Sequence, residues 1–508
     1  MADRLYTSQQ TDEFINGLRM ESQLEKSILA RIAFSLSLVR HGESVPVSNN
    51  FSGGELKRPT FFREEEVLIR TLISQVYQRS DFSDDEFYSN KSIIKNHIDA
   101  GAVLLWDLYE TSGRDIHKWY HELLSLIDLP SMQDPMGKNL DIYIGRELLT
   151  RNERFMEIND TAKHANSHLA IMGKPGVGKT QFLLKILADI RVQSQFQTHF
   201  IFFDYKGDVV ENNGFIEVTR ARSYRLLQNN ESLPINPFIL NAYDDQSVLL
   251  SAREKAESFA SINQRFGVVQ KGALTEAIVA AYAKRQATET PYPDFQDVLE
   301  IASMAYEEEG KRDDSLIEVL KDLAQFNLFW SYGSTVPPLE KLSNRTMVID
   351  VHAMPVLKEL VGYLVIERLY KEMAALPDSP IKEGRRTLRT ILVIDEAHNY
   401  LGQKNIFLQR IIREGRSKGI VVFFASQSPS DYQQKEFNFQ ELLEFAYIFQ
   451  CEGVSASAIQ DILGCSSKTA KDLQTEIARL EPFQVISRSQ QKTEEFVKFA
   501  AEAFYRNY

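Results

Sequence analysis

The sequence has little cysteine and no long apolar run. Cys451 and Cys465 are the only two cysteines among 508 residues, and neither has a partner at metal-ligand spacing. This argues against a disulfide framework and a zinc site, and it favours a reducing compartment. The N-terminus lacks the apolar core of a signal peptide, and no window approaches the roughly 18 uninterrupted apolar residues of a membrane-spanning helix. We therefore expect a cytoplasmic protein that needs a partner for any role at a membrane.

A basic excess is also absent. The formal net charge is −12, whereas nucleic-acid-binding domains commonly carry an excess of Lys and Arg. Any contact with DNA must therefore be local, made by a few loops, and the global charge argues against wrapping DNA around the outer surface. Hydrophobic residues at 43% and charged residues at 25% match globular proteins. The length predicts about three domains, one of which can be small.

Residues 1–128 are predicted to form a small, mainly helical domain. Apolar residues between positions 28 and 39 recur at spacings of one, three and four, which places them on one face of a helix. Further helices are expected at 64–78 and 93–108, and turn-forming residues predict a loop at 45–59. The proposed domain boundary is marked by Pro130, Pro135 and Gly137.

Residues 138–508 are predicted to form an α/β domain. Short runs rich in Ile, Val and Phe alternate with longer helical patterns, which is typical of a mostly parallel sheet flanked by helices. The runs show little alternation, as expected of strands that are buried on both faces. The predicted strands are 168–172, 200–204, 347–351, 391–395, 420–425 and 447–451. A mostly helical stretch at about 247–328 is interpreted as an insertion or subdomain.

A phosphate loop follows the first of these strands and precedes an amphipathic helix. It consists of Gly173, Lys174, Pro175, Gly176, Val177, Gly178, Lys179 and Thr180, with Gln181 next in the helix. Glycines let the backbone curl so that its N–H groups face phosphates, while Lys179 reaches the β/γ oxygens and Thr180 ligates Mg²⁺. A plain glycine-rich turn is the alternative, but strand, loop and helix occur in the required order. We therefore predict a site for ATP and Mg²⁺.

Two adjacent acids end the predicted strand at 391–395. In P-loop enzymes an acid here holds Mg²⁺ and a neighbouring carboxylate polarises the attacking water, so Asp395 is the predicted metal ligand and Glu396 the predicted base. Alone, two acids at a strand end are more often solvated than catalytic. Together with the phosphate loop they indicate hydrolysis. His398 completes a tetrapeptide found in many helicases, but the other motifs of a two-lobed helicase are missing, so we expect it only to orient the acids.

Polar residues flank the predicted strand at 420–425. Arg413 or Arg416 could stabilise transition-state charge on a neighbouring subunit's nucleotide, or they could simply complement the dipole at a helix end. Gln427 could sense the γ-phosphate or position water, or it could be an ordinary loop residue. The residues alone leave these alternatives open.

Taken together, these motifs resemble those of the HerA/FtsK superfamily of hexameric DNA-pumping ATPases, and the HerA branch most closely. The similarity spans about residues 140–490 and includes the segments 203–208, 233–237, 395–398, 413–416 and 425–430. It implies a RecA-like core, a homohexameric ring and double-stranded DNA as partner. The resemblance assigns nucleotide binding to Lys179 and Thr180, Mg²⁺ to Asp395, water activation to Glu396, polar sensing to Gln427 and an arginine finger to Arg413 or Arg416.

The N-terminal region departs from that family. HerA proteins usually begin with a small β-barrel that docks a nuclease, but residues 1–128 are predicted to be helical. The segments 4–8, 27–38, 52–55 and 97–101 instead resemble DndE, a small helical protein of DNA phosphorothioation systems. This resemblance implies a DNA-binding or oligomerising accessory domain in a prokaryotic anti-phage or DNA-modification system.

Two functions therefore compete. The first is an ATP-driven translocase of double-stranded DNA that works with a nuclease or other effector in anti-phage defence or phosphorothioation-linked restriction. The alternative is a nucleotide-dependent assembly scaffold that activates a partner enzyme. A conjugative or secretion pump is disfavoured because the sequence has no membrane segment. Stimulation of ATP turnover by DNA would separate the first two.

Overall fold

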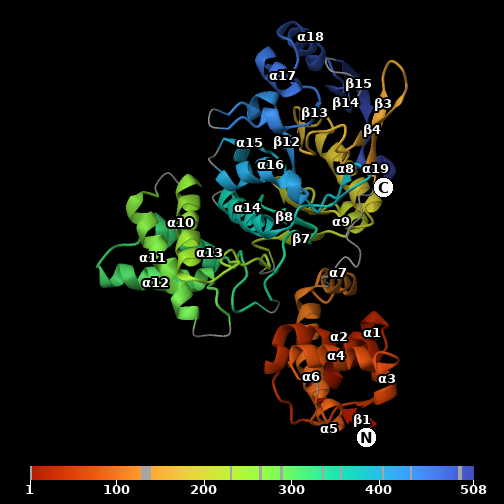
Figure 1. Cartoon of the computed structure of the whole chain (residues 1–508), viewed down its shortest axis with the longest axis vertical. Coiled ribbons are helices and arrows are strands. Elements are labelled where there is room, and N and C mark those ends of the chain that lie inside the picture. The colour runs from red at the N-terminus through yellow and green to blue at the C-terminus, as the bar shows by residue number, and fades with distance from the viewer. Residues whose placement is uncertain are drawn as a thin grey trace. The chain divides into compact units, whose positions relative to one another are not determined.

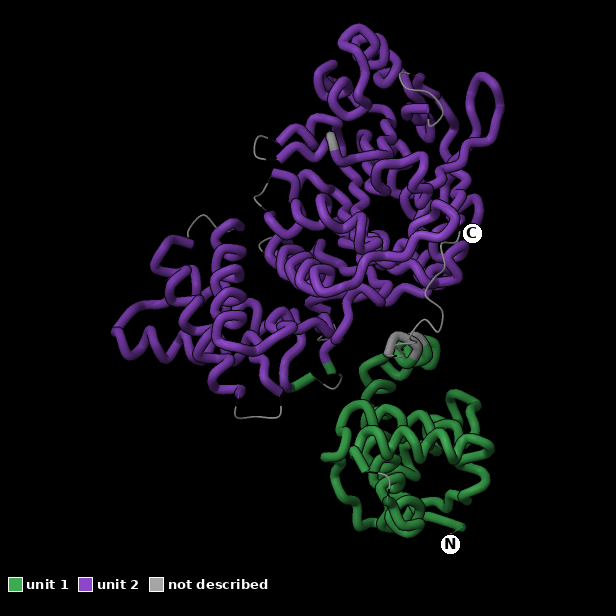
Figure 2. Tube along the Cα trace, in the orientation of Figure 1, with its two compact units in different colours: residues 1–127, 333–337 green, residues 128–332, 338–508 purple. Residues whose placement is uncertain are grey.

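The protein is described by a computed structural model in two compact units (Figure 2). The first contains residues 1–127 and 333–337, and the second contains residues 128–332 and 338–508. The predicted boundary at Pro130, Pro135 and Gly137 lies outside the described residues. The described ranges are 3–79, 81–126, 139–228, 231–262, 266–286, 290–334, 337–354, 357–402, 405–434, 437–489 and 495–508.

The first unit is mainly helical, as predicted. Its helices are α1 (Gln9–Ser22), α2 (Lys26–His41), α3 (Arg58–Phe62), α4 (Glu66–Val76), α5 (Asp84–Phe87), α6 (Ile93–Thr111) and α7 (Ile116–Leu126). Helices α2 and α6 approach so closely at Gly101 that a Cβ there would lie 1.7 Å from the Ala33 carbonyl oxygen. The loop predicted at 45–59 contains an unpredicted strand, β2 (Glu55–Lys57), which pairs antiparallel with β1 (Arg4–Tyr6). Three-residue strands are too short to show an alternating pattern.

A buried histidine links three elements of the first unit. His97 on α6 has no exposed surface, and its Nδ1 lies 2.9 Å from Ser37 Oγ while its Nε2 lies 3.0 Å from Tyr77 Oη. Burial lowers the pKa of His97 to about 4. Both ring nitrogens thus have partners, and the native unit favours the neutral imidazole.

The first unit should lose stability in mild acid. Histidine in the unfolded chain titrates near pH ~6.5, so the unfolded state binds more protons as pH falls from there towards 4. The free energy of unfolding should then fall by at most about 3 kcal/mol. Urea unfolding can be followed by tryptophan fluorescence in a Trp330→Phe chain, where Trp106 and Trp119 of the first unit remain. The same pH slope in a His97→Gln chain would contradict this assignment.

The second unit is built on an eleven-stranded sheet in the described part of the chain (Figure 1). Seven neighbouring strands are parallel, in the order β13 (Phe445–Ile448), β5 (Leu169–Met172), β12 (Ile420–Ser426), β11 (Thr390–Ile394), β6 (His199–Asp204), β8 (Met347–Asp350) and β7 (Arg222–Arg225). Beyond β13 the sheet continues antiparallel through β14 (Gln484–Arg488), β15 (Phe496–Ala501), β3 (Asp141–Glu147) and β4 (Glu153–Glu157). A separate two-stranded ladder joins β9 (Ile381–Lys382) to β10 (Arg385–Arg386).

The predicted fold class is confirmed, and all six predicted strands fall within the parallel part. The bounds of the last one, predicted at 447–451, are wrong: the strand runs from Phe445 to Ile448, so it begins two residues earlier and ends three residues earlier. Its parallel partner β5 ends at Met172, where the phosphate loop begins, so the ladder cannot continue as far as predicted. The antiparallel strands were not predicted, because half-exposed positions and charged residues interrupt their apolar pattern.

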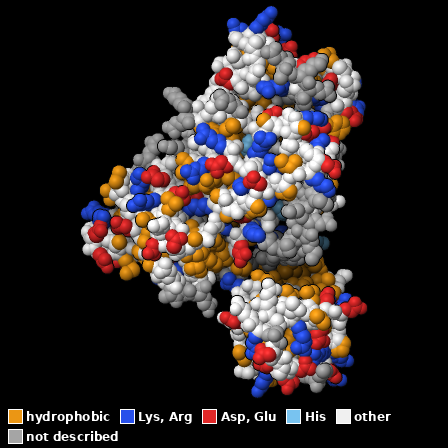
Figure 3. All heavy atoms as spheres, viewed as in Figure 1, with side chains coloured by type: hydrophobic (Ala, Val, Ile, Leu, Met, Phe, Trp, Pro, Cys, Tyr) orange, Lys and Arg blue, Asp and Glu red, His pale blue; other side chains and the backbone are white. Residues whose placement is uncertain are grey.

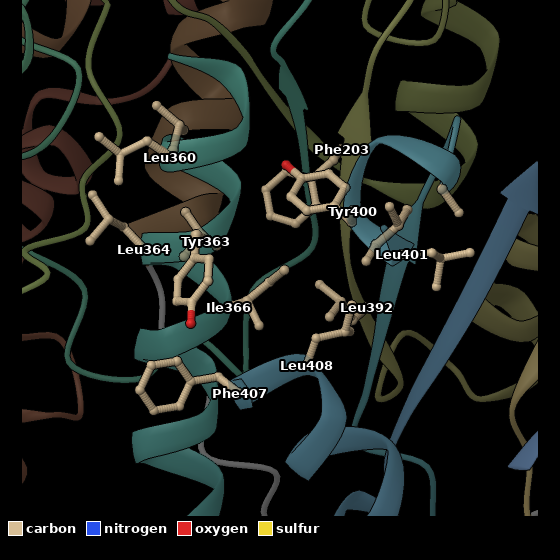
Figure 4. Packing of buried hydrophobic residues seen from close by; sticks show 14 of the residues in the cluster. Phe203, Leu360, Tyr363, Leu364, Ile366, Leu392, Tyr400, Leu401, Phe407 and Leu408 are labelled. Atoms are coloured by element: carbon tan, nitrogen blue, oxygen red, sulfur yellow. The ribbon is translucent and has the colours of Figure 1, made fainter. Parts of the chain in front are cut away.

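Helices cover both faces of the parallel strands. Along β11, Ile391 and Val393 join one apolar cluster, whereas Leu392 and Ile394 join the other. Figure 4 shows the second cluster, where side chains of α14 and α16 gather beside Leu392. This two-sided burial explains why the strands show no alternation in sequence. The helices of this domain are α8 (Lys179–Gln193), α9 (Asn213–Thr219), α14 (Lys358–Ala375), α15 (His398–Leu401), α16 (Ile406–Lys418), α17 (Ala456–Leu463), α18 (Ser467–Ala478) and α19 (Phe504–Asn507).

A helical segment lies between β7 and β8. Its described helices are α10 (Asp245–Ile262), α11 (Val268–Arg285), α12 (Phe295–Glu308) and α13 (Ser315–Gln325). A buried ion pair fixes α10 to α14: Lys255 Nζ lies 3.0 Å from Glu367 Oε1, and each side chain is 1% exposed. Lys371 Nζ lies 2.7 Å from the same oxygen. In the described residues, every helix is too short or too polar to cross a bilayer.

Candidate functional site

The phosphate loop connects β5 to α8 and is held by the strands on both sides. The N–H of Gly173 donates to the Ser426 carbonyl of β12 at 3.2 Å, and the N–H of Lys174 donates to the Gln450 carbonyl at 2.8 Å. Gly178 has φ of +104°, and a Cβ there would lie 2.6 Å from the Phe483 ring. Position 178 therefore requires glycine for its backbone and for the space around it.

Lys179 folds back over this loop. Its ammonium donates to the carbonyls of Gly173 and Lys174, at 2.5 and 3.0 Å. Burial and the nearby charge of Lys206 lower the pKa of Lys179, although Glu396 and Asp395 act against this shift. The ammonium thus lies at the centre of the loop, near both acids.

The remaining loop residues differ in exposure. Pro175 and Gly176 are exposed, and the Val177 side chain is buried in the core. Thr180 is half-buried in the first turn of α8. Gln181 follows it, and its Oε1 accepts a hydrogen bond from the Tyr505 N–H at 3.4 Å. The exposed glycine leaves the tip of the loop open to a ligand.

The two acids follow β11, which is separated from β5 only by β12. Asp395 is 1% exposed, and its Oδ2 has no hydrogen-bond partner among the described residues. Burial raises the pKa of Asp395 to about 6; Glu396 adds to this shift, and Lys206 opposes it. Burying a carboxylate oxygen without a hydrogen-bond partner costs free energy of folding unless a cation compensates its charge. The donor set therefore fits Mg²⁺, which proteins often bind with one or two carboxylates and substrate phosphates.

No group of three metal-ligating side chains occurs among the described residues. The side chains in question are those of His, Cys, Asp and Glu. Mg²⁺ is often held by one or two carboxylates together with substrate phosphates, so the lone Asp395 carboxylate is compatible with such a site.

Glu396 is the centre of a polar cluster. Its Oε1 lies 2.6 Å from Lys206 Nζ, and its Oε2 accepts from Gln427 Nε2 at 3.0 Å. His398 Nδ1 lies 3.4 Å from the same Oε2. Burial acts to raise the pKa of Glu396, but the hydrogen bonds from Lys206 and Gln427 outweigh it and lower the pKa. The structure therefore brings Gln427 and His398 to an ionised Glu396.

Lys206 was not among the predicted site residues. It follows β6, the neighbour of β11, in a loop shaped by Asp204. The Asp204 carboxylate accepts from the N–H groups of Lys206, Gly207, Val209 and Val210 at 2.8–3.2 Å. The sequence places a lysine after a strand, but it does not show that this strand lies beside β11.

Arg413 and Arg416 lie away from the phosphate loop of their own chain. Both are exposed near the end of α16, which runs back to the start of β12. Gln427 follows the other end of β12, and the seven residues of that strand span about 20 Å. The Arg413 guanidinium lies 4.7 Å from the Phe437 ring, and the charge of Arg416 adds to burial in lowering the pKa of Arg386. The structure does not bring either arginine to the acids of the same chain.

Comparisons with known proteins agree with the resemblances seen in the motifs. Residues 4–112 match the family model of the DNA sulphur modification protein DndE, and residues 143–373 match that of the helicase HerA central domain. The DNA import protein CedB of Sulfolobus acidocaldarius is 23% identical over 332 residues, which are 64% of this chain and 49% of CedB. The chain thus spans about half the length of that relative.

One solved structure shares the fold of the second unit. VirB4 of Thermoanaerobacter pseudethanolicus matches with a TM-score of 0.54 and 18% identity, over 73% of this chain and 98% of that one. The plasmid coupling protein TrwB in complex with ADP and Mg²⁺ matches more weakly, with a TM-score of 0.42 and 14% identity over 72% and 94% of the two chains. The VirB4 match supports the architecture of the second unit.

Proposed function

We propose that this chain, which carries a HerA-type P-loop ATPase region behind a DndE-like region, is an ATP-driven translocase of double-stranded DNA that works as a homohexameric ring. The proposal is supported above all by one observation: the phosphate loop, the buried Asp395 and the ion-paired Glu396 meet at the carboxyl ends of the central strands. The DndE match supports a role beside a nuclease or another effector in cytoplasmic defence or phosphorothioation-linked restriction. In that setting residues 1–128 serve as an accessory domain that binds DNA or aids assembly.

The site residues divide the chemistry of hydrolysis among them. Lys179 and the loop N–H groups hold the β- and γ-phosphates, and Thr180 with Asp395 would hold Mg²⁺, which neutralises phosphate charge. Glu396 takes a proton from water as the water oxygen bonds to the γ-phosphorus. The bond from that phosphorus to the β–γ bridging oxygen breaks, giving ADP and phosphate.

Lys206 and Gln427 hold Glu396 ionised and oriented towards the water. A neighbouring subunit supplies Arg413 or Arg416 to the developing charge. Catalysis by this scheme requires an assembled ring.

DNA contacts are expected from a few loops that line the ring channel. On the face shown in Figure 3, Lys and Arg side chains are interspersed with Asp and Glu and form no single basic area. Loops that contact DNA phosphates release counterions, so the affinity for DNA should fall steeply with salt and show little sequence preference.

The function is tested by ATP turnover with and without linear double-stranded DNA, and by displacement of a third strand from a DNA triplex. We expect DNA to stimulate turnover and ATP to drive displacement, with hexamers in native mass spectra. Turnover that ignores DNA, without displacement, would favour the nucleotide-dependent scaffold instead. A shallow salt slope with strong base discrimination would contradict the channel contacts.

Replacing Lys206 should slow hydrolysis without removing the nucleotide. A Lys206→Met chain loses the cation 2.6 Å from Glu396 Oε1, so the base loses its orientation, and turnover should fall about 10- to 100-fold. Lys206→Arg should recover part of the activity, because a guanidinium restores the charge. Lys418→Met, which breaks an exposed ion pair with Asp378, is the matched control in a steady-state ATPase assay. Equal losses in both methionine variants would show that Lys206 has no special role.

A further inference from the structure

A strained phenylalanine lies against the phosphate loop. Phe483 has φ of +62°, a left-handed conformation that is unusual for a bulky residue. Its N–H donates to the Val177 carbonyl at 2.9 Å, and its carbonyl accepts from the Ala501 N–H at 2.7 Å. Its ring lies where a Cβ at Gly178 would fall. Such strain persists only where the surrounding structure enforces it, and it is concentrated at functional sites.

The end of the chain adds a second aromatic ring and a cation. Tyr505 on α19 is 57% exposed, and its ring centroid lies 6.2 Å from that of Phe483 in an edge-to-face arrangement. The Arg506 guanidinium lies 4.9 Å from the Phe483 ring and 5.6 Å from the Tyr505 ring. Helix α19 is fixed to α8, because the Tyr505 N–H donates to Gln181 and the Tyr508 hydroxyl donates to Asp189 at 2.9 Å. We call Phe483, Tyr505 and Arg506 the tail cluster.

The sheet order determines which end of a nucleotide faces the tail cluster. Glu396 follows β11, on one side of β5, whereas Phe483 immediately precedes β14, on the other side. A triphosphate in the loop has its γ-phosphate beside Lys179 and Glu396. Its nucleoside must therefore leave the loop on the side of β13 and β14, where the tail cluster lies.

The chemistry of the tail cluster matches that end of the molecule. Nucleobases stack on aromatic rings and guanidinium planes, and such stacking contributes about 1–3 kcal/mol per base. Every base has a π-face and can stack in this way, and a purine offers a larger face than a pyrimidine. An exposed ring beside a guanidinium, fixed next to a phosphate loop, provides the surface that stacking requires.

We propose that the tail cluster is the subsite that receives the nucleobase of the bound nucleoside triphosphate. This inference rests on the proposed ATPase function and adds to it the place where the base binds. Stacking on these groups raises affinity for the nucleoside, and purines gain more than pyrimidines because their rings offer a larger face.

The test compares ligands with and without a base. Affinities for ATP, CTP and inorganic tripolyphosphate are measured by calorimetry on the full chain and on Tyr505→Ala, Arg506→Ala and the double variant. Both positions are exposed, so the substitutions should leave the fold intact. In the double variant, we expect the affinity for ATP to fall at least 5-fold, the advantage of ATP over CTP to shrink, and the affinity for tripolyphosphate to stay constant. Tyr508→Phe, which removes the hydroxyl bond to Asp189 just after the helix and leaves all three side chains of the cluster in place, is the control.

The other outcomes have distinct meanings. Equal losses for ATP and tripolyphosphate would show that the tail cluster only supports the loop, and no loss for either would place the base elsewhere; both results overturn the subsite. A wild-type chain that binds ATP and tripolyphosphate with equal affinity also overturns it. A wild-type chain that binds neither ligand would instead overturn the proposed function itself. Phe483→Gly, which tolerates the left-handed backbone, removes the third ring and should reproduce the selective loss.

Discussion

A Glu396→Gln chain should bind ATP and fail to hydrolyse it, with turnover lowered about 10²- to 10⁴-fold. Glutamine has nearly the shape of glutamate but cannot accept the proton of the attacking water. The phosphate loop and Asp395 are untouched, so the nucleotide should remain bound. Steady-state turnover and retention of labelled ATP on the isolated protein measure the two effects separately.

The companion variants sharpen this expectation. Lys179→Ala should lose turnover and also bind ATP weakly, because the charge on the β/γ oxygens is gone. Asp395→Ala should regain part of its activity at high Mg²⁺, whereas Glu396→Gln should not. Glu153→Gln, at an exposed pair with Arg146 on the far edge of the sheet, is the control for loss of a carboxylate. Normal turnover in Glu396→Gln would show that another group is the base.

Removing the arginine finger should lower turnover roughly 10³- to 10⁵-fold, and the loss should be repaired by a second chain. Arg416 lies near the end of α16, just before the start of β12, whereas Gln427 follows the other end of that strand. Arg416 therefore cannot reach the nucleotide of its own subunit. If Arg413 or Arg416 serves a neighbour, hydrolysis per subunit should rise with protein concentration as rings form.

Mixing experiments identify the finger. An excess of Lys179→Ala chains, which keep their arginines, should restore turnover to Arg413→Ala or Arg416→Ala chains, although each parent alone is nearly inactive. Arg410→Ala, one turn earlier on α16 and 3.4 Å from the Tyr370 hydroxyl, should behave as the wild type. Rings of both finger variants that show no complementation would rule out the mechanism between subunits.

Six of the seven parallel strands could be predicted because burial on both faces leaves a local signature. The seventh, β7, was missed because its sequence, Arg-Ser-Tyr-Arg, lacks that signature. The six predicted runs are rich in Ile, Val and Phe, and β11 and β12 send alternate side chains into two different clusters. The antiparallel strands β3 and β4 lack that signature, since exposed Glu153 and half-exposed Arg154 belong to one of them. They pair with each other, and β3 also pairs with the distant β15, which no local pattern encodes.

In the candidate site, too, the local motifs could be predicted from the sequence, whereas the residues that the fold brings to them could not. The phosphate loop and the two acids are contiguous motifs, so the spacing of their residues already indicates the chemistry. Lys206 and Phe483 come close to these motifs only because β6 lies beside β11 and because the segment before β14 folds against the loop. The arginines differ from Lys206 and Phe483: the sequence names Arg413 and Arg416 as candidates, but the role proposed for them requires a neighbouring subunit.

The buried charges between α10 and α14 restrict how this architecture can change in evolution. Exchanging the helical segment between β7 and β8 for one that covers α14 but lacks a cation at the place of Lys255 would leave Glu367 buried with Lys371 alone. Losing one member of such a group costs about 3–5 kcal/mol, because a charge stays buried without its full compensation. The segment is therefore not a module that can be exchanged or trimmed freely. An exchanged segment must keep a cation at the place of Lys255, or α14 must carry a matching substitution at position 367.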